Sequence, residues 1–172
     1  MTLEINHTVD NETYRHKING HEFVLHCHHY LTLTAKLAED FSDIGAPQVL
    51  IEVTEDSIRP LLDDYFTEHK ITSPEERIAI GAEHYAFMGL GMMEISVTDK
   101  GGKVTLKHSH MDEGWLKKWG KNKTPVNQFT CGFVAAIFGA AYSKEKRGFG
   151  VKESKSIVMG AKESVLVVSA TS

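Results

Sequence analysis

A chain of 172 residues is a usual size for one domain and can bury a sizeable core without disulfide staples. Hydrophobic residues make up 41% of the chain and charged residues 24%, which excludes an intrinsically disordered protein. The formal net charge of −4 comes without a basic stripe, so nucleic acid is not an expected partner.

The chain begins without the charged start and apolar core of a secretory signal, and no apolar run approaches the ~18 residues that a membrane span needs. Its two cysteines, Cys27 and Cys131, stand far apart. Without an export signal, such a chain is expected to keep its thiols reduced. We therefore expect a cytoplasmic protein with no membrane span.

The first twenty residues are polar and end in Asn19-Gly20, a turn signal, so we expect an N-terminal arm or an irregular lead-in over 1–20. A helical period follows from Phe23 to Phe41. The apolar residues of this segment, Tyr30 and Leu37 among them, fall on one arc, which predicts a helix with one inward face.

Two further helices are expected before the first strand. Gly45-Ala46-Pro47 ends the first helix, and residues 48–69 are mostly helical in character, with Pro60 either in a first turn or at a kink. Ser73-Pro74-Glu75-Glu76 is the clearest helix start in the chain, with a serine cap, a proline and a glutamate three residues after the cap. The helix that it opens is expected to reach Met88.

The period then changes from about 3.6 residues to two. Apolar and polar residues alternate over 93–98 and again over 104–109, with a turn between, which predicts a β-hairpin. A helix rich in Ala and Gly is expected over 127–142. A second hairpin is expected from strands near 151–158 and 165–169. This order predicts an α+β fold, with N-terminal helices packed on an antiparallel sheet built from two hairpins with an intervening helix.

The run His26-Cys27-His28-His29 opens the first predicted helix. Helical geometry places His26 on the apolar arc, His28 on the polar side and His29 at the boundary. His26 and His29 are three residues apart, a spacing at which two imidazoles can share one metal ion. The alternative is a buried, hydrogen-bonded histidine at a helix start, with the other histidines in solvent.

His108 and His110 share a strand face with Val104 and Leu106 if the strand continues. Two inward imidazoles are costly unless a metal or a polar ligand satisfies them. In the alternative, the strand ends at His108 and His110 lies in a loop.

Histidines on three elements could meet in a zinc or iron site, with Glu83, Asp112 or Glu113 completing it. The sequence holds no His-Glu-x-x-His or paired Cys-x-x-Cys motif, so such a site depends on the elements converging. The candidate metal ligands are His26, His29, His84, His108 and His110.

The C-terminal part, from about His108 to Ser169, resembles the vinyl-4-reductase-like, or hydrocarbon-binding, domain family. The resemblance is carried by His108-Ser109-His110 before Trp115, by Pro125-Val126 leading into Gly132, and by Val151-Lys152-Glu153 followed by Gly160 and Leu166. That family is similar in fold to Golgi transport complex subunits and to haem nitric-oxide-binding domains. The resemblance implies an α+β fold, often dimeric, with an internal pocket and a small-molecule or sensory role.

Many members of this family carry cysteines beside the last turn, where this chain has Ser156 and Ser164. A thiolate metal site or a disulfide at that place is therefore excluded. If this protein binds a metal, histidines must hold it.

The sequence predicts one vinyl-4-reductase-like ligand-binding domain over 1–172. Our first hypothesis is a homodimeric binding protein that holds a small apolar molecule or a metal ion in an internal pocket lined by histidines, with Tyr30 and Trp115 contacting the bound group. Zinc and iron are the expected metals, and haem is kept as an alternative. The second hypothesis is a metal-dependent enzyme with an open coordination position, in which a carboxylate or Tyr30 moves a proton. A binding protein is favoured over an enzyme, and no catalytic residue is assigned.

Overall fold

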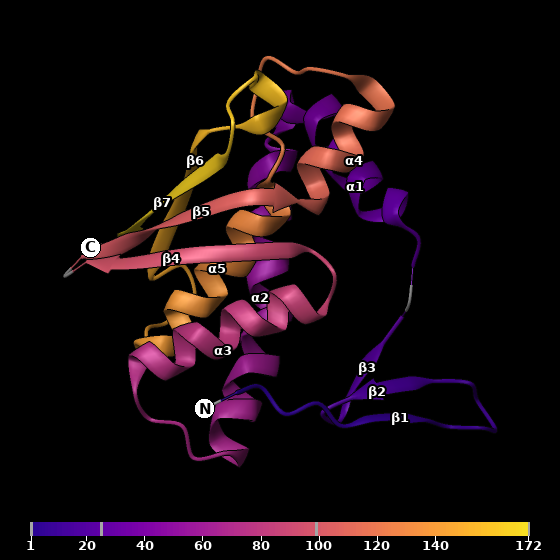
Figure 1. The fold of residues 1–172 in the computed structure, drawn as a ribbon, viewed down its shortest axis with the longest axis vertical. Coiled ribbons are helices and arrows are strands. Elements are labelled where there is room, and N and C mark those ends of the chain that lie inside the picture. The colour runs from indigo at the N-terminus through magenta and orange to yellow at the C-terminus, as the bar shows by residue number, and fades with distance from the viewer. Residues whose placement is uncertain (1, 25, 99, 172) are drawn as a thin grey trace.

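The computed structural model describes residues 2–24, 26–98 and 100–171, without the side chain of His28. The described chain is an α+β domain with an antiparallel four-stranded sheet in the order β4-β5-β7-β6 (Figure 1). The strands of this sheet are β4 (Gly91–Thr98), β5 (Gly101–Ser109), β6 (Phe149–Lys155) and β7 (Ser164–Ala170). Both predicted hairpin regions are therefore confirmed as parts of one sheet.

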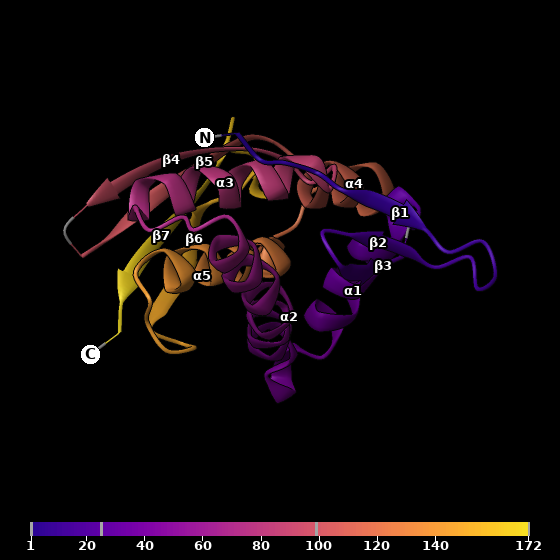
Figure 2. The same ribbon diagram turned by 90° about the horizontal axis from the view of Figure 1, so that it is seen from below.

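Helices cover one face of this sheet. Figure 2 shows α3 and α5 beside the sheet and α2 beyond α5. The helices are α1 (His28–Asp40), α2 (Ala46–Glu68), α3 (Pro74–Phe87), α4 (His110–Trp119) and α5 (Gln128–Ala141), and short 3₁₀ turns form η1 (Ser42–Ile44) and η2 (Ile157–Met159). No helix within the described residues is long and apolar enough to cross a membrane.

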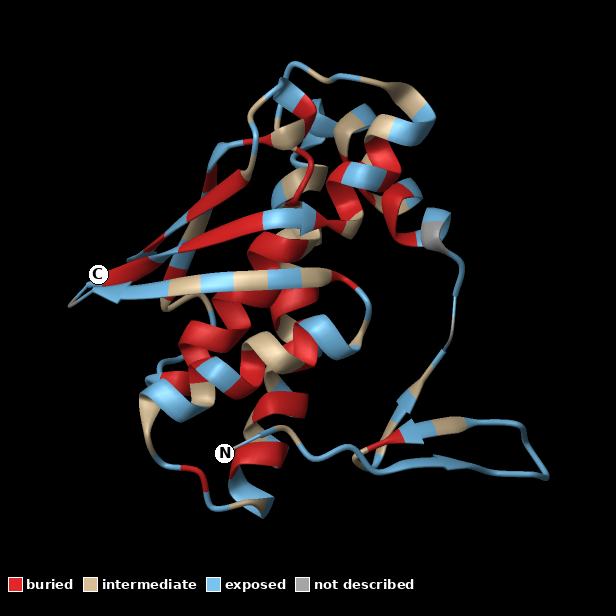
Figure 3. Ribbon diagram, viewed as in Figure 1, coloured by how far each residue is buried: buried red, intermediate tan, exposed pale blue. Residues whose placement is uncertain are grey.

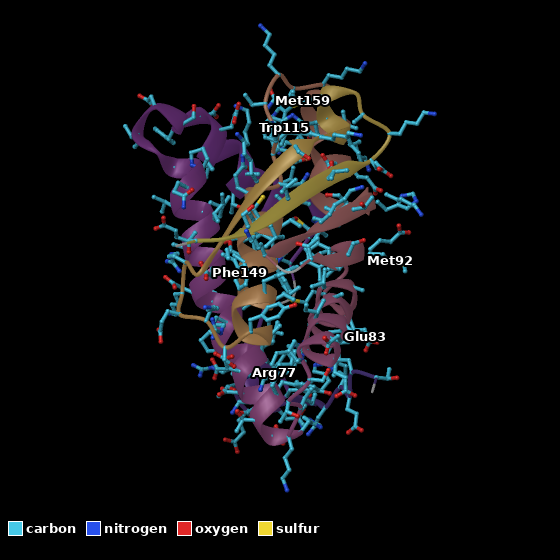
Figure 4. The ribbon with its side chains drawn as sticks, turned by 90° about the vertical axis from the view of Figure 1, so that its left-hand side faces the viewer. Arg77, Glu83, Met92, Trp115, Phe149 and Met159 are labelled. Carbon is cyan, nitrogen blue, oxygen red and sulfur yellow. The ribbon has the colours of Figure 1, made fainter. Side chains whose placement is uncertain are left out.

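The central helix α5 is buried on all sides from Thr130 to Ala141 (Figure 3). Its residues are apolar all round, which is the pattern of a helix enclosed by a core. Gly132 brings α5 against α2, because a Cβ at this position would lie 2.2 Å from the Ile51 carbonyl oxygen. At the other end, the Arg77 guanidinium donates a hydrogen bond to the Ala140 carbonyl at 3.0 Å, far along the molecule from Trp115 (Figure 4).

The predicted start of α3 is confirmed. The Ser73 hydroxyl accepts a hydrogen bond from the Glu76 N–H at 3.3 Å, and Pro74 is the first helical residue. Proline fits this position because the first N–H groups of a helix lack intrahelical partners. Pro60 lies inside α2, which runs unbroken through the segment predicted to be mostly helical.

Two elements differ from the prediction. Residues 2–23, where the prediction was an arm or an irregular lead-in, contain a three-stranded antiparallel sheet of β1 (His7–Val9), β2 (His16–Ile18) and β3 (His21–Phe23). Residues 110–119, which were not predicted as a helix, form α4, because the Ser109 hydroxyl caps it by accepting from the Asp112 N–H at 3.2 Å.

Helix α1 also departs from the expected single inward arc. Leu31, Ala35 and Ala38 face the core, whereas Tyr30 and Leu37 are exposed. The helix begins only at His28, so the arc drawn from Phe23 did not follow one continuous helix. Helix α1 therefore has buried apolar residues on one side and exposed apolar residues on another.

Candidate ligand-binding site

His26 and His29, at the start of α1, do not reach the core. His26 precedes the helix and is exposed, which corrects the expectation that it faces inward, and its ring is tilted against Tyr30 with the centroids 5.2 Å apart. His29 is exposed in the first turn, and the side chain of His28 lies outside the described residues. Tyr30, predicted to contact a bound group, lies on the exposed side of α1.

A bulge in β5 turns His108 away from the core. Gly91 pairs with Ser109 and Met93 with Leu106, so two residues of β5, Lys107 and His108, face the single Met92 of β4. An extra residue in a strand reverses the alternation beyond it. Ser109 is buried, while His108 points into solvent and pairs with Glu113 at 3.2 Å. The expectation of an inward His108 is therefore wrong.

His110 lies neither on an inward strand face nor in a loop. It is the first residue of α4 and half-buried, and its N–H donates to the Leu90 carbonyl at 3.0 Å. One turn further along α4, Trp115 is buried in the core with its ring 4.9 Å from that of Trp119. Tyr30 and Trp115 thus lie in different surroundings, one exposed and one buried.

The five predicted metal ligands do not form one cluster. Within the described part of the chain, no group of three or more His, Cys, Asp or Glu side chains is placed to hold a metal ion. The expected zinc, iron or haem centre shared by these histidines therefore gains no geometric support, and metal binding stays a prediction.

His84 is the candidate ligand that the structure buries. It is 3% exposed, on α3, and its ring meets the edge of the Tyr65 ring from α2 at 90° and 5.2 Å. Burial, together with the nearby His21, lowers its pKa to about 4, so the imidazole is neutral at pH 7. Its Nε2 atom has no hydrogen-bond partner among the described residues.

The N-terminal segment closes over this part of α2 and α3. The Leu3 N–H donates to Glu83 Oε2 at 2.5 Å, and the Glu4 N–H donates to the Tyr65 hydroxyl at 2.7 Å. His21 of β3 lies 3.4 Å from an Asp64 carboxylate oxygen of α2. Both residues that hold the N-terminal segment are close to His84. The Tyr65 ring contacts the His84 ring, and Glu83 precedes His84 in the chain.

A buried imidazole nitrogen without a partner can form a strong hydrogen bond with a ligand. In neutral histidine one ring nitrogen donates and the other accepts, so Nε2 can serve either a hydroxyl or a carbonyl group, depending on the tautomer. The helices that carry His84 and Tyr65 also bury apolar residues: Ile80 and Tyr85 of α3 and Phe66 of α2 are each at most 1% exposed. A neutral imidazole in this apolar part of the core is therefore a hydrogen-bonding group that an uncharged molecule can use.

A second buried polar cluster joins α4, α5 and the last two strands. Asn127 Nδ2 donates to Asp112 Oδ2 at 2.8 Å and to Glu153 Oε1 at 2.9 Å. Ser109 donates to Asn127 Oδ1 at 2.8 Å, and Ser164 donates to Asp112 Oδ2 at 2.8 Å. We call these five residues the Asn127 network. All five are buried.

The Asn127 network accounts for Ser164, one of the two serines that stand where the resemblance leads one to expect cysteines. The buried Ser164 hydroxyl, besides donating to Asp112, accepts from the Ile157 N–H at 2.9 Å. Ser156 is also buried. Burial and the neighbouring Asp112 raise the pKa of Glu153. Hydroxyls, an amide and two carboxyl groups that bond one another thus occupy this place, without the thiolates that the resemblance leads one to expect.

A groove of about 490 Å³ opens beside the Asn127 network. Its lining includes Ile51, Pro125, Gln128, Cys131 and Glu153. Burial raises the pKa of the Cys131 thiol, so this cysteine is not an activated nucleophile. Gln128 Oε1 is buried here without a hydrogen-bond partner among the described residues.

The Asn127 network was missed by sequence reasoning. Asn127 and Asp112 lie at helix starts, where polar residues usually serve as caps. One signal was available, because Glu153 lies two residues from Val151 in a strand, which puts a carboxylate on the face of an apolar residue. The sequence could not show that Ser109 joins the network, because the β5 bulge turns it inward.

No protein-family model matches this chain, and no curated protein matches it in sequence. Solved structures do. The phenol-responsive sensory domain of the transcription activator PoxR, solved with phenol, matches with a TM-score of 0.79 at 12% identity, over 95% of this chain and 84% of that one.

Two structures match less closely. A trafficking protein particle complex subunit 3 from Naegleria fowleri, covalently bound to palmitic acid, has a TM-score of 0.54 at 9% identity over 83% of this chain and 95% of that one. A vinyl-4-reductase family protein from Methanocaldococcus jannaschii has a TM-score of 0.50 at 15% identity, over 87% and 98%. The chain therefore has the fold of these proteins, as its resemblance to the vinyl-4-reductase-like family predicts.

Proposed function

We propose that this protein is a sensory domain that binds a small, mostly apolar molecule through one hydrogen bond to His84. The buried Nε2 atom of His84, which lacks a hydrogen-bond partner among the described residues, is the observation that carries the proposal. The likeness in fold to a phenol-responsive sensory domain supports it, because that domain serves a ligand of this class.

The chemistry of the site favours a hydroxylated aromatic molecule. Leaving a polar group buried without a partner costs roughly 1–3 kcal/mol, and a ligand hydroxyl that pairs with Nε2 removes this cost. The neutral state of His84 suits an uncharged ligand. The Tyr65 ring, perpendicular to the His84 ring with the centroids 5.2 Å apart, provides an aromatic neighbour for such a molecule.

A sensory domain must also change when its ligand binds. The N-terminal segment is held by hydrogen bonds to Glu83, which precedes His84 in the chain, and to Tyr65, whose ring contacts that of His84. A ligand that displaces Tyr65 slightly would alter the hold on this segment. We therefore assign the N-terminal segment and β1–β3 as the part that responds to binding.

The experiment titrates the full chain with phenol and with benzene. Isothermal titration calorimetry measures the binding, and the midpoint of thermal unfolding measures the stabilisation. We expect phenol to bind and to raise the midpoint. Benzene, which lacks the hydroxyl, should bind more weakly. His84→Leu should weaken phenol binding by about 10-fold or more while leaving benzene binding nearly unchanged, since it removes only the hydrogen bond.

Gln128→Leu is the matched control, because it removes another buried polar atom that lacks a hydrogen-bond partner among the described residues, this one in the groove beside the Asn127 network. This variant should bind phenol as the wild type does. Loss of binding in Gln128→Leu but not in His84→Leu would move the ligand to that groove and refute the assignment of His84. Absence of phenol binding to the wild type would refute the ligand class.

A further inference from the structure

Two histidine rings meet on the hairpin formed by β1 and β2, which stands apart from the four-stranded sheet (Figures 1 and 2). Nε2 of His7 lies 2.9 Å from Nδ1 of His16, and the ring planes are 16° apart with their centroids at 5.2 Å. The register places Val9 opposite His16, and His7 lies two residues before Val9 on β1. The two histidines are therefore diagonal neighbours on one face of the sheet.

The turn between the two strands holds this arrangement in place. The Asp10 N–H donates to the Arg15 carbonyl at 2.9 Å. The Asp10 carboxylate accepts from the Glu12 N–H and from the Thr13 hydroxyl, both at 2.8 Å. Because Asp10 follows β1 and Arg15 precedes β2, these bonds fix the register beside the two histidines. A frame that is fixed beforehand lowers the entropy cost of binding.

The face of the sheet that carries the two histidines holds no lysine or arginine from the three strands. By alternation, Thr8, Lys17 and Glu22 point to the opposite face. The strand residues on the histidine face are His7, Val9, His16, Ile18, His21 and Phe23. A cation that binds on this face therefore meets no like charge from β1–β3.

We infer that His7 and His16 form a binding site for a divalent transition-metal ion, which we call the hairpin histidine site. A zinc ion binds imidazole nitrogens at about 2.0–2.1 Å, so two nitrogens on adjacent coordination positions lie about 2.8–3.4 Å apart. The 2.9 Å between His7 Nε2 and His16 Nδ1 falls in this range. Imidazole suits zinc, nickel and copper, whereas magnesium and calcium prefer oxygen ligands.

The two ring nitrogens share one proton when no metal is bound. In a contact between neutral imidazoles, one ring nitrogen must donate and the other accept. A metal ion takes the place of this proton, which moves to the other nitrogen of the donor ring, so both rings coordinate in their neutral form. His7 is exposed and His16 half-buried, so the rings can turn to aim both lone pairs at one ion.

A bound ion would join β1 to β2. Their sheet has strands of three residues each, and Ile18 alone among those strand residues is buried. Such a small sheet is marginally stable in water, and a metal ion bound across two strands stabilises the folded hairpin. Two protein ligands leave the other coordination positions to water, since no group of three or more ligating side chains is placed for a metal within residues 2–24, 26–98 and 100–171.

Titration of the full chain with Zn²⁺ tests the hairpin histidine site, with Cu²⁺ and Mg²⁺ for comparison. In isothermal titration calorimetry, the tightest event should take up a single Zn²⁺ per chain, Cu²⁺ should bind more tightly, and Mg²⁺ should not bind. NMR of the histidine ring nitrogens identifies the ligands in the wild type. The signals of His7 Nε2 and His16 Nδ1 should shift when an equimolar amount of Zn²⁺ is added.

His7→Gln removes one ligand but keeps a hydrogen-bonding side chain. Loss of a group that merely supports a ligand costs about 10–100-fold in metal affinity, so this variant should bind Zn²⁺ at least about 10-fold more weakly. His108→Gln is the matched control, because His108 is also an exposed strand histidine, here 3.2 Å from a Glu113 carboxylate oxygen. This control should bind Zn²⁺ as the wild type does.

Three results would overturn the inference: a wild type that binds neither Zn²⁺ nor Cu²⁺, a folded His7→Gln variant with the affinity of the wild type, or NMR shifts confined to other histidines. Weaker binding in His108→Gln but not in His7→Gln would place the ion on β5 and would equally overturn it. If His7→Gln loses its hairpin, the NMR spectrum of the wild type decides alone.

Discussion

At the scale of single residues, the polar groups that matter are those the fold buries, not those that cluster in the sequence. Four of the five predicted metal ligands lie at the surface or half-buried, whereas His84, which has no histidine near it in sequence, is enclosed. An imidazole held in apolar surroundings loses its charge, since desolvation penalises the protonated form. His84 thus becomes a neutral hydrogen-bonding group, which is what recognition of an uncharged molecule requires.

The depressed pKa of His84 predicts a loss of stability in acid. Its pKa is about 4 in the folded chain against 6.5 as an ordinary histidine, so between these values the unfolded chain binds more protons. The contribution of His84 is therefore complete above about pH 6.5 and is lost as the pH falls toward 4, by an amount on the order of 3 kcal/mol. Urea unfolding at pH 7 and pH 4.5 measures it.

The control for this pH dependence is His84→Leu, which cannot be protonated. The difference in stability between wild type and variant isolates His84 from Glu153, whose raised pKa acts in the opposite direction as the pH rises. A wild type and a variant that lose the same stability on acidification would show that His84 is accessible to protons in the folded chain.

Asn127 is the residue on which the buried carboxyl groups depend. Asn127→Leu keeps the side-chain volume but removes the amide that donates to both Asp112 and Glu153. We expect a loss of about 3 kcal/mol or more in the free energy of unfolding, because two buried acids then lose a shared donor. The exposed Asn11→Leu should change stability by less than about 0.5 kcal/mol. A loss below about 1 kcal/mol at Asn127 would mean that water replaces the amide.

At the scale of elements, periodicity predicted the main helices and strands, apart from α4 and β1–β3, but not how their faces are oriented. The bulge in β5 inserts one residue, and this is enough to turn His108 outward and Ser109 inward. In α1 the start of the helix decided which residues share a face. Both differences have a local geometric cause that residue spacing in a sequence does not reveal.

The contact between α2 and α5 gives a prediction opposite in sign to helix propensity. In an unconstrained helix Gly→Ala stabilises by up to about 1 kcal/mol. Gly132→Ala should instead destabilise by about 2 kcal/mol, because the new Cβ would meet the Ile51 carbonyl at 2.2 Å and the Thr54 Cβ at 2.7 Å. Thermal unfolding measures this loss.

Gly139→Ala on the same helix is the comparison for Gly132→Ala. Its new Cβ would meet the tip of the flexible Arg59 side chain, which can move aside. This variant should lose little stability. If the two variants behave alike, the backbones of α2 and α5 separate without cost, and the close approach of the helices is not a determinant of the fold.

At the scale of the whole molecule, the chain has a closely packed part and a part with exposed apolar side chains. The four-stranded sheet with α2, α3 and α5 encloses the core, whereas α1 and β1–β3 present apolar or uncovered surfaces on the other side (Figure 3). The same N-terminal segment crosses the surroundings of His84 through Leu3 and Glu4. In our proposed function, binding at His84 therefore acts on this segment, which is how a sensory domain would transmit a signal.

The sequence by itself determined the α+β class, the order of the main elements, the cap of α3 and the buried central helix, because these depend on residue spacing within one segment. It also indicated the fold relationship, through short stretches of the C-terminal part. Only the tertiary structure decided the sites. The isolation of His84, the gathering of Ser109, Asn127 and Glu153 from separate elements, and the uncovered side of α1 all depend on contacts between distant segments. Burial and pairing of polar groups arise from those contacts, which no local pattern contains.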